Sequence, residues 1–313
     1  MSAGRPPSTS SVLVAGESLV DVVIGPDGQT IESAPGGAPL NIAVGLARLG
    51  VPTALLTTIG ADDYGERVAR HVHDSGVALH EGVHDSGSTS VARALLDEQH
   101  HATYEFALSW DPPEAVLPAA CAAVHIGSLG TVIAPGDARM ADLAARARAA
   151  GVVVSYDPNV RPAVLGDVAD PWSDVRRIAA GAAVVKLSDQ DGEYLQPGRS
   201  LDDLLDALLR GEHTQLAAIT RGEHGLLLAT EDHRVHVPAP KVDVVDTVGA
   251  GDACMAGLLA ALHQRGQLDR SSLRRLDAAD LDAIGAMAAR VAALTCARRG
   301  ANPPWLAELD GGA

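Results

Sequence analysis

The residue types best suited to chemistry in this sequence lie in residues 245–258 (VDTVGAGDACMAGL). A strand-like approach leads to Gly249-Ala250-Gly251, and Asp252 then opens an apolar helix. Because these small residues carry no bulky side chains, consecutive backbone N–H groups can converge on one point, where the positive end of the helix dipole also acts. The segment predicts an anion hole with the Asp252 carboxylate at its rim. A glycine turn followed by a helix cap is the structural alternative, and these residues alone leave both open.

Two other segments place polar groups where a ligand could reach them. Residues 36–41 (GGAPLN) stand at the head of a predicted helix, and their glycine pair would let a ligand approach the backbone. Residues 157–161 (DPNVR) follow a predicted buried strand, so their side chains should lie at a carboxyl strand end. Each segment also has the composition of an ordinary loop or turn.

The elements that must position these segments alternate along the chain. Short apolar runs predict buried strands, and stretches with helical spacing predict helices between them. The strands are expected at 12–16, 53–59, 122–126, 152–156, 183–187 and 216–220, and the helices at 40–49, 64–74 and 137–150. This order predicts a mostly parallel sheet covered on both faces, with its ligand site beyond the carboxyl ends of the strands. Segments 19–33 and 89–109 alternate instead with a period of two, which predicts a small antiparallel sheet that projects as a lid.

Composition narrows the class of protein. The chain has 313 residues, 47% of them hydrophobic and only 3% aromatic, which predicts a large aliphatic core. Its net charge of −16 excludes a phosphate backbone or an anionic membrane as the expected partner. We expect a single α/β domain over 12–306, with a flexible leader at 1–11 and a tail at 307–313. Without an apolar targeting run, and with three scattered cysteines, the expected location is the cytoplasm.

Taken together, these segments resemble the ribokinase-like (PfkB) family of carbohydrate kinases over nearly the whole chain. Residues 36–50 (GGAPLNIAVGLARLG) are similar to the N-terminal signature of that family, and residues 246–262 (DTVGAGDACMAGLLAAL) are similar to its C-terminal signature. The stretches most like the fructokinase and 2-keto-3-deoxygluconate kinase branches are DPNVR at 157–161, VKLSD at 185–189 and ARRGANPP at 297–304. The resemblance implies a three-layer α/β/α sandwich with a small β-sheet lid.

The activity that this resemblance implies is ATP-dependent phosphorylation of a sugar hydroxyl. Asp252 matches the catalytic base, and the N–H groups of Gly249, Ala250, Gly251 and Asp252 match the anion hole that stabilises the transferring phosphoryl group. The residues that match sugar-binding positions are Asp21, Gly36, Gly37 and Asn41. Arg161 resembles an arginine that approaches either the phosphates or an acidic substrate.

On the nucleotide side, the resemblance assigns contacts with ATP to Thr220, Gly222 and Gly225. The family often carries Asn-x-x-Glu near the metal, and here Ser188-Asp189-Gln190-Asp191 replaces it. Ser188 and Asp191 could serve with shorter side chains, or Mg²⁺ could be held mainly through phosphates and water. Asp246 resembles a side chain near a monovalent-cation site, so K⁺ is a second candidate ion.

Two classes of function remain open at this point: a sugar kinase, and a non-catalytic sugar- or nucleotide-binding regulator on the same fold. The retained Asp252 and glycines favour the enzyme. Among substrates, Asp21 and Asn41 favour a neutral ketohexose, with D-fructose first, whereas Arg161 would suit 2-keto-3-deoxygluconate. A nucleoside is less favoured because the chain has only eight aromatic residues for stacking. A small sheet is marginal alone, so we also expect two lids to pack together in a homodimer.

Overall fold

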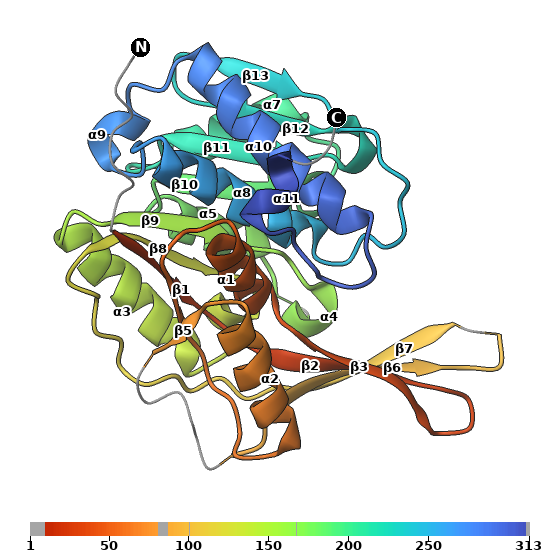
Figure 1. Ribbon diagram of the computed structural model, residues 1–313. Coiled ribbons are helices and arrows are strands. Elements are labelled where there is room, and N and C mark those ends of the chain that lie inside the picture. The colour runs from red at the N-terminus through yellow and green to blue at the C-terminus, as the bar shows by residue number, and fades with distance from the viewer. Residues whose placement is uncertain (1–9, 81–86, 100, 167, 311–313) are drawn as a thin grey trace.

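Runs of aliphatic residues form the central sheet of the computed structural model, which describes residues 10–80, 87–99, 101–166 and 168–310 (Figure 1). Parts of the predicted leader (1–9) and tail (311–313) therefore lie outside the described residues. The sheet has nine strands in the order β13-β12-β11-β10-β9-β8-β1-β4-β5. Their bounds are β1 Ser11–Ala15, β4 Thr53–Leu56, β5 Ala78–Leu79, β8 Cys121–Gly127, β9 Val153–Asp157, β10 Val184–Ser188, β11 Leu216–Thr220, β12 Leu226–Ala229 and β13 Arg234–Val237.

Neighbouring strands from β5 to β11 pair parallel. At the other edge, β12 pairs antiparallel with both β11 and β13. The predicted mostly parallel sheet is confirmed. The strand expected at 53–59 ends earlier, at Leu56. No strand leads into the glycine turn, because residues 238–248 are irregular and include an exposed run of valines.

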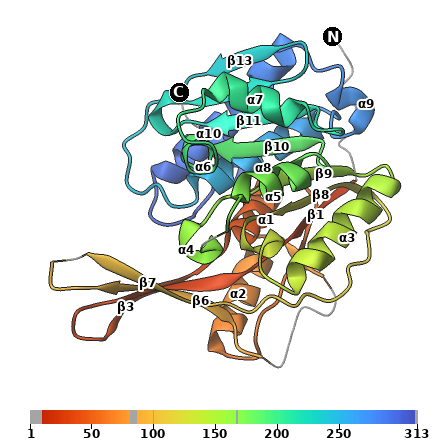
Figure 2. The same cartoon turned by 180° about the vertical axis from the view of Figure 1, so that it is seen from behind.

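Helices cover both faces of this sheet, which gives the expected three layers (Figures 1 and 2). The helices that bury apolar side chains on one face are α1 Ala38–Arg48, α2 Asp63–Asp74, α8 Ala250–Gln264, α9 Arg270–Leu273 and α10 Ala278–Cys296. Those on the other face are α3 Gly136–Ala149, α5 Pro171–Ala179, α6 Asp189–Leu195 and α7 Leu201–Leu209. Short helical segments complete the chain: η1 Ser128–Thr131, α4 Pro162–Leu165, η2 Gly222–His224 and α11 Leu306–Asp310.

The two predicted lid segments form a separate four-stranded sheet that projects from the main body (Figures 1 and 2). Its strands are β2 Leu19–Ile24, β3 Thr30–Gly36, β6 Ser90–Leu96 and β7 Ala102–Ala107, in the order β3-β2-β6-β7. The outer pairs are antiparallel hairpins, and the central pair β2–β6 is parallel. The period-two pattern therefore predicted both hairpins, but not the parallel pairing that joins them.

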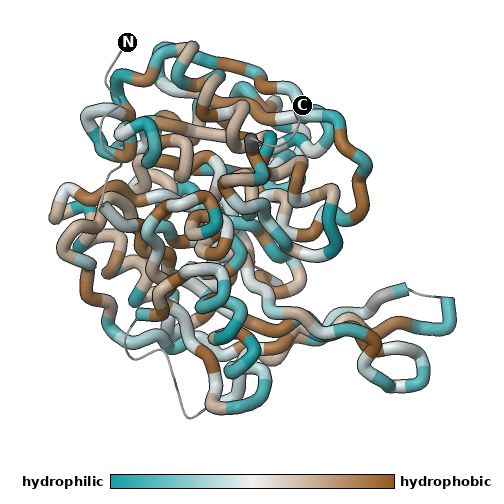
Figure 3. Tube along the Cα trace, viewed as in Figure 1, coloured by the Kyte–Doolittle hydropathy of each residue, from teal (hydrophilic) through white to brown (hydrophobic). Residues whose placement is uncertain are grey.

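Hydropathy along the chain follows this layering. The central strands are apolar and buried, whereas many loops and parts of the surrounding helices are hydrophilic (Figure 3). In the part of the chain that is described, no helix combines the length and apolar character needed to cross a bilayer.

Candidate active site

The glycine turn before α8 has the conformation that an anion hole requires. Gly249 is the N-cap residue and adopts φ +75°, in the left-handed region that favours glycine. The Ala250 N–H donates to the carbonyl oxygen of Thr247 (3.2 Å), so it belongs to the turn itself. The N–H groups of Gly251 and Asp252 lie in the first helical turn, where no intrahelical acceptor exists. These two donors, at the positive end of a 15-residue helix, are free to bind an anion.

Asp252 is the third residue of α8, and its carboxylate is held by two side-chain amides. Asn41 Nδ2 donates to Oδ2 at 2.8 Å, and Asn159 Nδ2 lies 3.5 Å from Oδ1. Burial raises the pKa of Asp252, while the Asn41 hydrogen bond and the charges of Lys186 and Arg161 pull it back down. The result is an oriented carboxylate whose pKa stays above the ordinary value for aspartate, as suits a general base.

The predicted sugar-side residues gather around the N-terminus of α1. Gly37, the N-cap, has φ +105°, and a side chain there would meet the carbonyl oxygen of Glu17. Gly36 makes room for Asp21, because a Cβ at Gly36 would overlap with Asp21 Oδ2. Asn41 is buried, and its Oδ1 has no hydrogen-bond partner among the described residues. A hydroxyl group of a bound sugar could satisfy that acceptor.

Arg161 follows β9 and faces the same space. Its guanidinium donates to the carbonyl oxygens of Asn159 (3.3 Å) and Val160 (3.1 Å). Its charge lowers the pKa of Asp252 and partly offsets the burial that raises the pKa of Asp21, so it acts on both carboxylates. Arg161 therefore acts electrostatically on both the predicted sugar-side carboxylate, Asp21, and the predicted base, Asp252.

Sequence reasoning missed two buried titratable residues, Lys186 and Glu17. Lys186 entered the sequence analysis only as part of the VKLSD stretch, yet it forms an ion pair with Asp157 at 2.7 Å, with both side chains almost fully buried. Glu17 Oε2 accepts the Gly130 N–H at 2.8 Å, and burial raises the pKa of Glu17 to about 7. The available signal was their place in the sequence. Lys186 interrupts an apolar strand, and Glu17 directly follows the predicted buried strand at 12–16.

A cleft of about 460 Å³ runs along the carboxyl ends of β9 and β10 to the start of α8. It is lined by Asn159, Val160, Arg161, Pro162, Lys186, Ser188, Gln190, Asp191, Tyr194 and residues 247–252. Thr220, Gly222 and Gly225 do not line it. They lie at the carboxyl end of β11, where Thr220 is in register with Ser188, so they continue the edge from which the cleft opens.

The two predicted metal ligands already have partners. Asp191 accepts hydrogen bonds from the N–H groups of Val160 and Ser188, both at 2.8 Å, and forms a capping box with Ser188. Asp246 accepts from the N–H groups of Val248 (3.0 Å) and Gly300 (2.8 Å). Within the described ranges, no group of three or more His, Cys, Asp or Glu side chains could hold a metal ion. These residues do not fit a protein-built Mg²⁺ cage, so Mg²⁺ would have to be held chiefly by phosphates and water.

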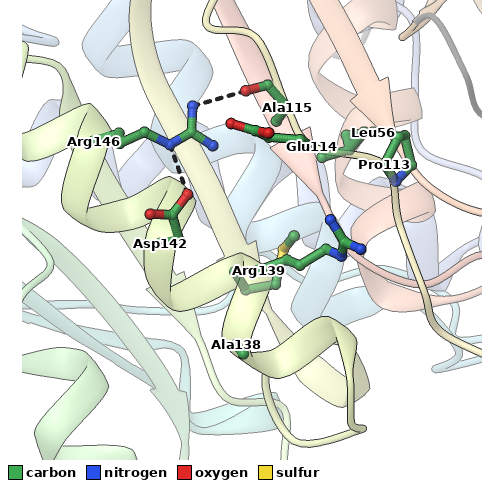
Figure 4. A pocket seen from close by; sticks show the side chains of 9 residues that line it. Leu56, Pro113, Glu114, Ala115, Ala138, Arg139, Asp142 and Arg146 are labelled. Carbon is green, nitrogen blue, oxygen red and sulfur yellow. Dashed lines mark hydrogen bonds and ion pairs between the residues drawn. The ribbon is translucent and has the colours of Figure 1, made fainter.

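A second cavity, of about 370 Å³, lies beside α3 and contains none of the predicted residues (Figure 4). Two arginines line it: Arg146 is paired with Asp142 (2.7 Å) and donates to the Ala115 carbonyl oxygen (2.8 Å), and Arg139 is paired with Asp111 (3.3 Å). Because these contacts occupy both guanidinium groups within the chain, we place the functional site at the α8 cleft.

Comparisons with known proteins agree with this geometry. Residues 9–308 match the family described as pfkB family carbohydrate kinase. A fructokinase of Rhizobium leguminosarum bv. trifolii is 34% identical over 282 residues, which cover 85% of this chain and 84% of that protein. The crystal structure of a fructokinase from Xylella fastidiosa with bound ATP superposes with a TM-score of 0.85 at 27% identity, covering 96% of this chain and 97% of that chain.

A double-mutant fructokinase from Vibrio cholerae O395, with fructose, ADP and a potassium ion bound, superposes with a TM-score of 0.82 at 26% identity. That match covers 98% of this chain and 99% of the other. The family match spans nearly the whole chain. The chain therefore belongs to the pfkB family of carbohydrate kinases.

Proposed function

We propose that this protein transfers the γ-phosphoryl group of ATP to a terminal hydroxyl of D-fructose. The observation that carries the proposal is the juxtaposition of the Asp252 carboxylate with the free N–H groups of Gly251 and Asp252 at one end of the cleft. The fructokinase relatives, and the fructose, ATP and ADP named in the neighbouring structures, support the choice of substrates.

The reaction uses the residues in a simple order. Asp252 accepts the proton of the sugar hydroxyl while the hydroxyl oxygen attacks the γ-phosphorus. The bond between the γ-phosphorus and the bridging oxygen breaks, and that oxygen leaves as part of ADP. The N–H groups of Gly251 and Asp252 stabilise the negative charge on the transferring group. Asn41 binds both the base and, through its free Oδ1, the sugar. Asp21 accepts hydrogen bonds from other hydroxyl groups of the sugar.

The cations follow from the same site. Mg²⁺ would enter with the phosphates of ATP and offset their charge. K⁺ would act near Asp246, whose carboxylate links the turn before α8 to the loop at Gly300. Replacing potassium chloride by choline chloride at equal ionic strength should then lower kcat.

The protein is proposed to work as a cytoplasmic homodimer. The support for two packed lids is the apolar surface of β7, where the stacked rings of Tyr104 and Phe106 are exposed. The support for the compartment is the set of three free cysteines.

The substrate is tested with an ADP-coupled assay of kcat/KM for fructose, 2-keto-3-deoxygluconate, ribose and a nucleoside. The acid is the informative competitor, because Arg161 offers a cation on the sugar side. We expect fructose to be preferred. A preference of tenfold or more for the acid, which corresponds to about 1.4 kcal/mol of transition-state binding, would overturn this choice.

A further inference from the structure

Lys186 lies beneath the catalytic turn and is the only lysine within an element of the main sheet; the other lysine of the sequence, Lys241, is exposed. Its Nζ is 2.7 Å from Asp157 Oδ2 and donates to the carbonyl oxygen of Gly251 at 3.2 Å. One ammonium group thus joins the end of β9, the middle of β10 and the first turn of α8.

The contact with Gly251 bears on the anion hole, because a peptide unit is planar and trans. The Gly251 C=O and the Asp252 N–H belong to the same unit and point in opposite directions. A donor that holds the carbonyl on the Lys186 side therefore directs the Asp252 N–H away from Lys186, into the hole. Glycine at position 251 leaves room for this contact, because a Cβ there would lie 3.2 Å from Nζ, which is tighter than an ordinary contact.

Asp157 also positions Asn159, the second amide beside the Asp252 carboxylate. Its Oδ1 accepts the Asn159 N–H at 3.2 Å, and Asn159 adopts φ +39° to bring its Nδ2 within 3.5 Å of Asp252 Oδ1. The Lys186–Asp157 pair is therefore linked to Asp252 by two routes, one through the backbone of α8 and one through the turn after β9.

The groups around Lys186 keep its ammonium group charged. The groups that face it are Asp157, Asp191, His125, Cys254 and Asp252. Burial lowers the pKa of His125 to about 3 and raises the pKa of the Cys254 thiol to about 11, so both are neutral at pH 7. Burial alone would lower the pKa of Lys186, but the carboxylate of Asp157 raises it and keeps the ammonium charged.

We propose that Lys186, held by Asp157, is a positioning residue for the phosphoryl transfer: it fixes the Gly251–Asp252 peptide and places a positive charge beside the carboxylate of the base. Burying an ion pair costs desolvation energy and is weak evidence for stability, so a role in the site accounts for the pair better. This inference rests on the proposed kinase reaction but not on the identity of the sugar.

The test is Lys186→Met, which keeps the length and removes the charge. We expect kcat to fall at least tenfold, while KM for the sugar stays within threefold because Lys186 does not contact the predicted sugar side. Asp252 is also faced by Glu17, Asp21, Asp157 and Arg161, which remain in the variant. Losing one of the two cations that lower its pKa should move the acid limb of kcat/KM to higher pH. Lys241→Met is the matched control, expected to leave kcat and the acid limb unchanged.

A second variant guards against misfolding, since Lys186→Met leaves Asp157 buried without its partner. Asp157→Asn combined with Lys186→Met removes both charges but still leaves the Gly251 carbonyl without its donor. We expect it to show wild-type far-UV circular dichroism with kcat still at least tenfold low.

A kcat within twofold of wild type in the double variant would make the pair merely structural and overturn the proposal. So would a folded Lys186→Met protein with an unmoved acid limb and kcat within threefold. Wild-type turnover across the sugar panel is measured first. A wild type inactive on fructose but active on another sugar contradicts the proposed substrate alone, and the variants are then compared on that sugar.

Discussion

At the scale of single residues, the candidate site is organised around one buried carboxylate, Asp252, which has to ionise if it is the base that we propose. Asn41 and Asn159 can only donate to Asp252 through their amide nitrogens, so they orient the carboxylate and favour its charged form. Burial opposes that charge more strongly, and the pKa remains raised. Burial and these hydrogen bonds together leave Asp252 with a raised proton affinity, which a general base needs in order to accept a proton.

Asp252→Asn is expected to lower kcat by about 10²- to 10⁴-fold, the usual contribution of a general base. The KM for fructose should change little, because the sugar contacts assigned to Asp21 and Asn41 remain. Turnover is measured in the ADP-coupled assay, with Asp142→Asn on α3 as a control far from the cleft. A well-folded variant with near-normal kcat would remove Asp252 from the role of base.

The pH dependence of turnover should carry the same signature. Only the ionised form of Asp252 accepts a proton, so activity is lost as the pH falls through its pKa. Because that pKa is raised, the acid limb of kcat/KM should lie above the pH at which an ordinary aspartate titrates, about 3.9. A profile that stays flat down to pH 4 would contradict the burial argument.

Glu17 makes a separate prediction about stability. Its pKa is about 7 in the folded protein and 4.5 ordinarily, so the folded state holds the proton more tightly. Its contribution to the free energy of unfolding is intact below pH 4.5 and declines as the pH rises to 7, by on the order of 3 kcal/mol. Glu17→Gln removes the titration and should flatten this part of the profile. Urea unfolding at pH 5 and pH 8 measures the free energy of unfolding of both proteins. If wild type and variant differ by the same amount at the two pH values, the fold does not hold Glu17 in a buried, protonated form.

Residue identity was easier to predict than residue environment. The sequence singled out Asp252, Asn41 and Arg161, because their types recur in recognisable motifs. It did not reveal that both carboxylate oxygens of Asp191 accept hydrogen bonds from backbone N–H groups. One of these donors, Val160, lies far away in the sequence, so the contact could not be predicted from local spacing. The partner of Lys186 was hidden for the same reason: it lies on another strand.

At the scale of elements, two glycines decide what the turns can do, one by its backbone conformation and the other by its lack of a side chain. Gly249 needs its left-handed conformation to start α8, and Gly36 needs its missing side chain to make room for Asp21. Apolar period predicted six strands of the main sheet and three of its covering helices, with boundaries shifted by a few residues, but it did not predict the edge strands β5, β12 and β13. The irregular approach at 238–248 did not follow, because its valines are exposed and only look like a buried strand.

Gly36→Ala tests the sugar side at this scale. The new methyl would overlap with the Asp21 carboxylate and displace it, so KM for fructose should rise at least tenfold with a smaller change in kcat. Thr30→Ala, at the exposed start of the same strand β3, is the control. Steady-state kinetics with saturating ATP separates the two constants. Unchanged KM in Gly36→Ala would show that Asp21 does not bind the sugar.

At the scale of the whole molecule, the projecting lid is the feature that the main core does not need. Tyr104 is 62% exposed and Phe106 is 37% exposed, with ring centroids 6.4 Å apart. A stacked aromatic pair on an edge strand is a liability for an isolated monomer. We expect sedimentation velocity at micromolar concentration to show a dimer, and Tyr104→Glu with Phe106→Glu to shift it to monomer. Thr103→Glu, an exposed residue on the alternate face of β7, is the control. A wild-type monomer with full activity would contradict the dimer.

The parallel pairing of β2 with β6 has a consequence for how the molecule is made. Each hairpin is local, but α1, β4, α2 and β5 lie between them in the chain, so the two can meet only after that intervening stretch has been folded back. The cover over the sugar end should therefore be the last part to assemble and the first to come apart. If this sheet is the lid, it can close over a sugar only after the N-terminal half of the chain has folded, so sugar binding would report that this half is complete.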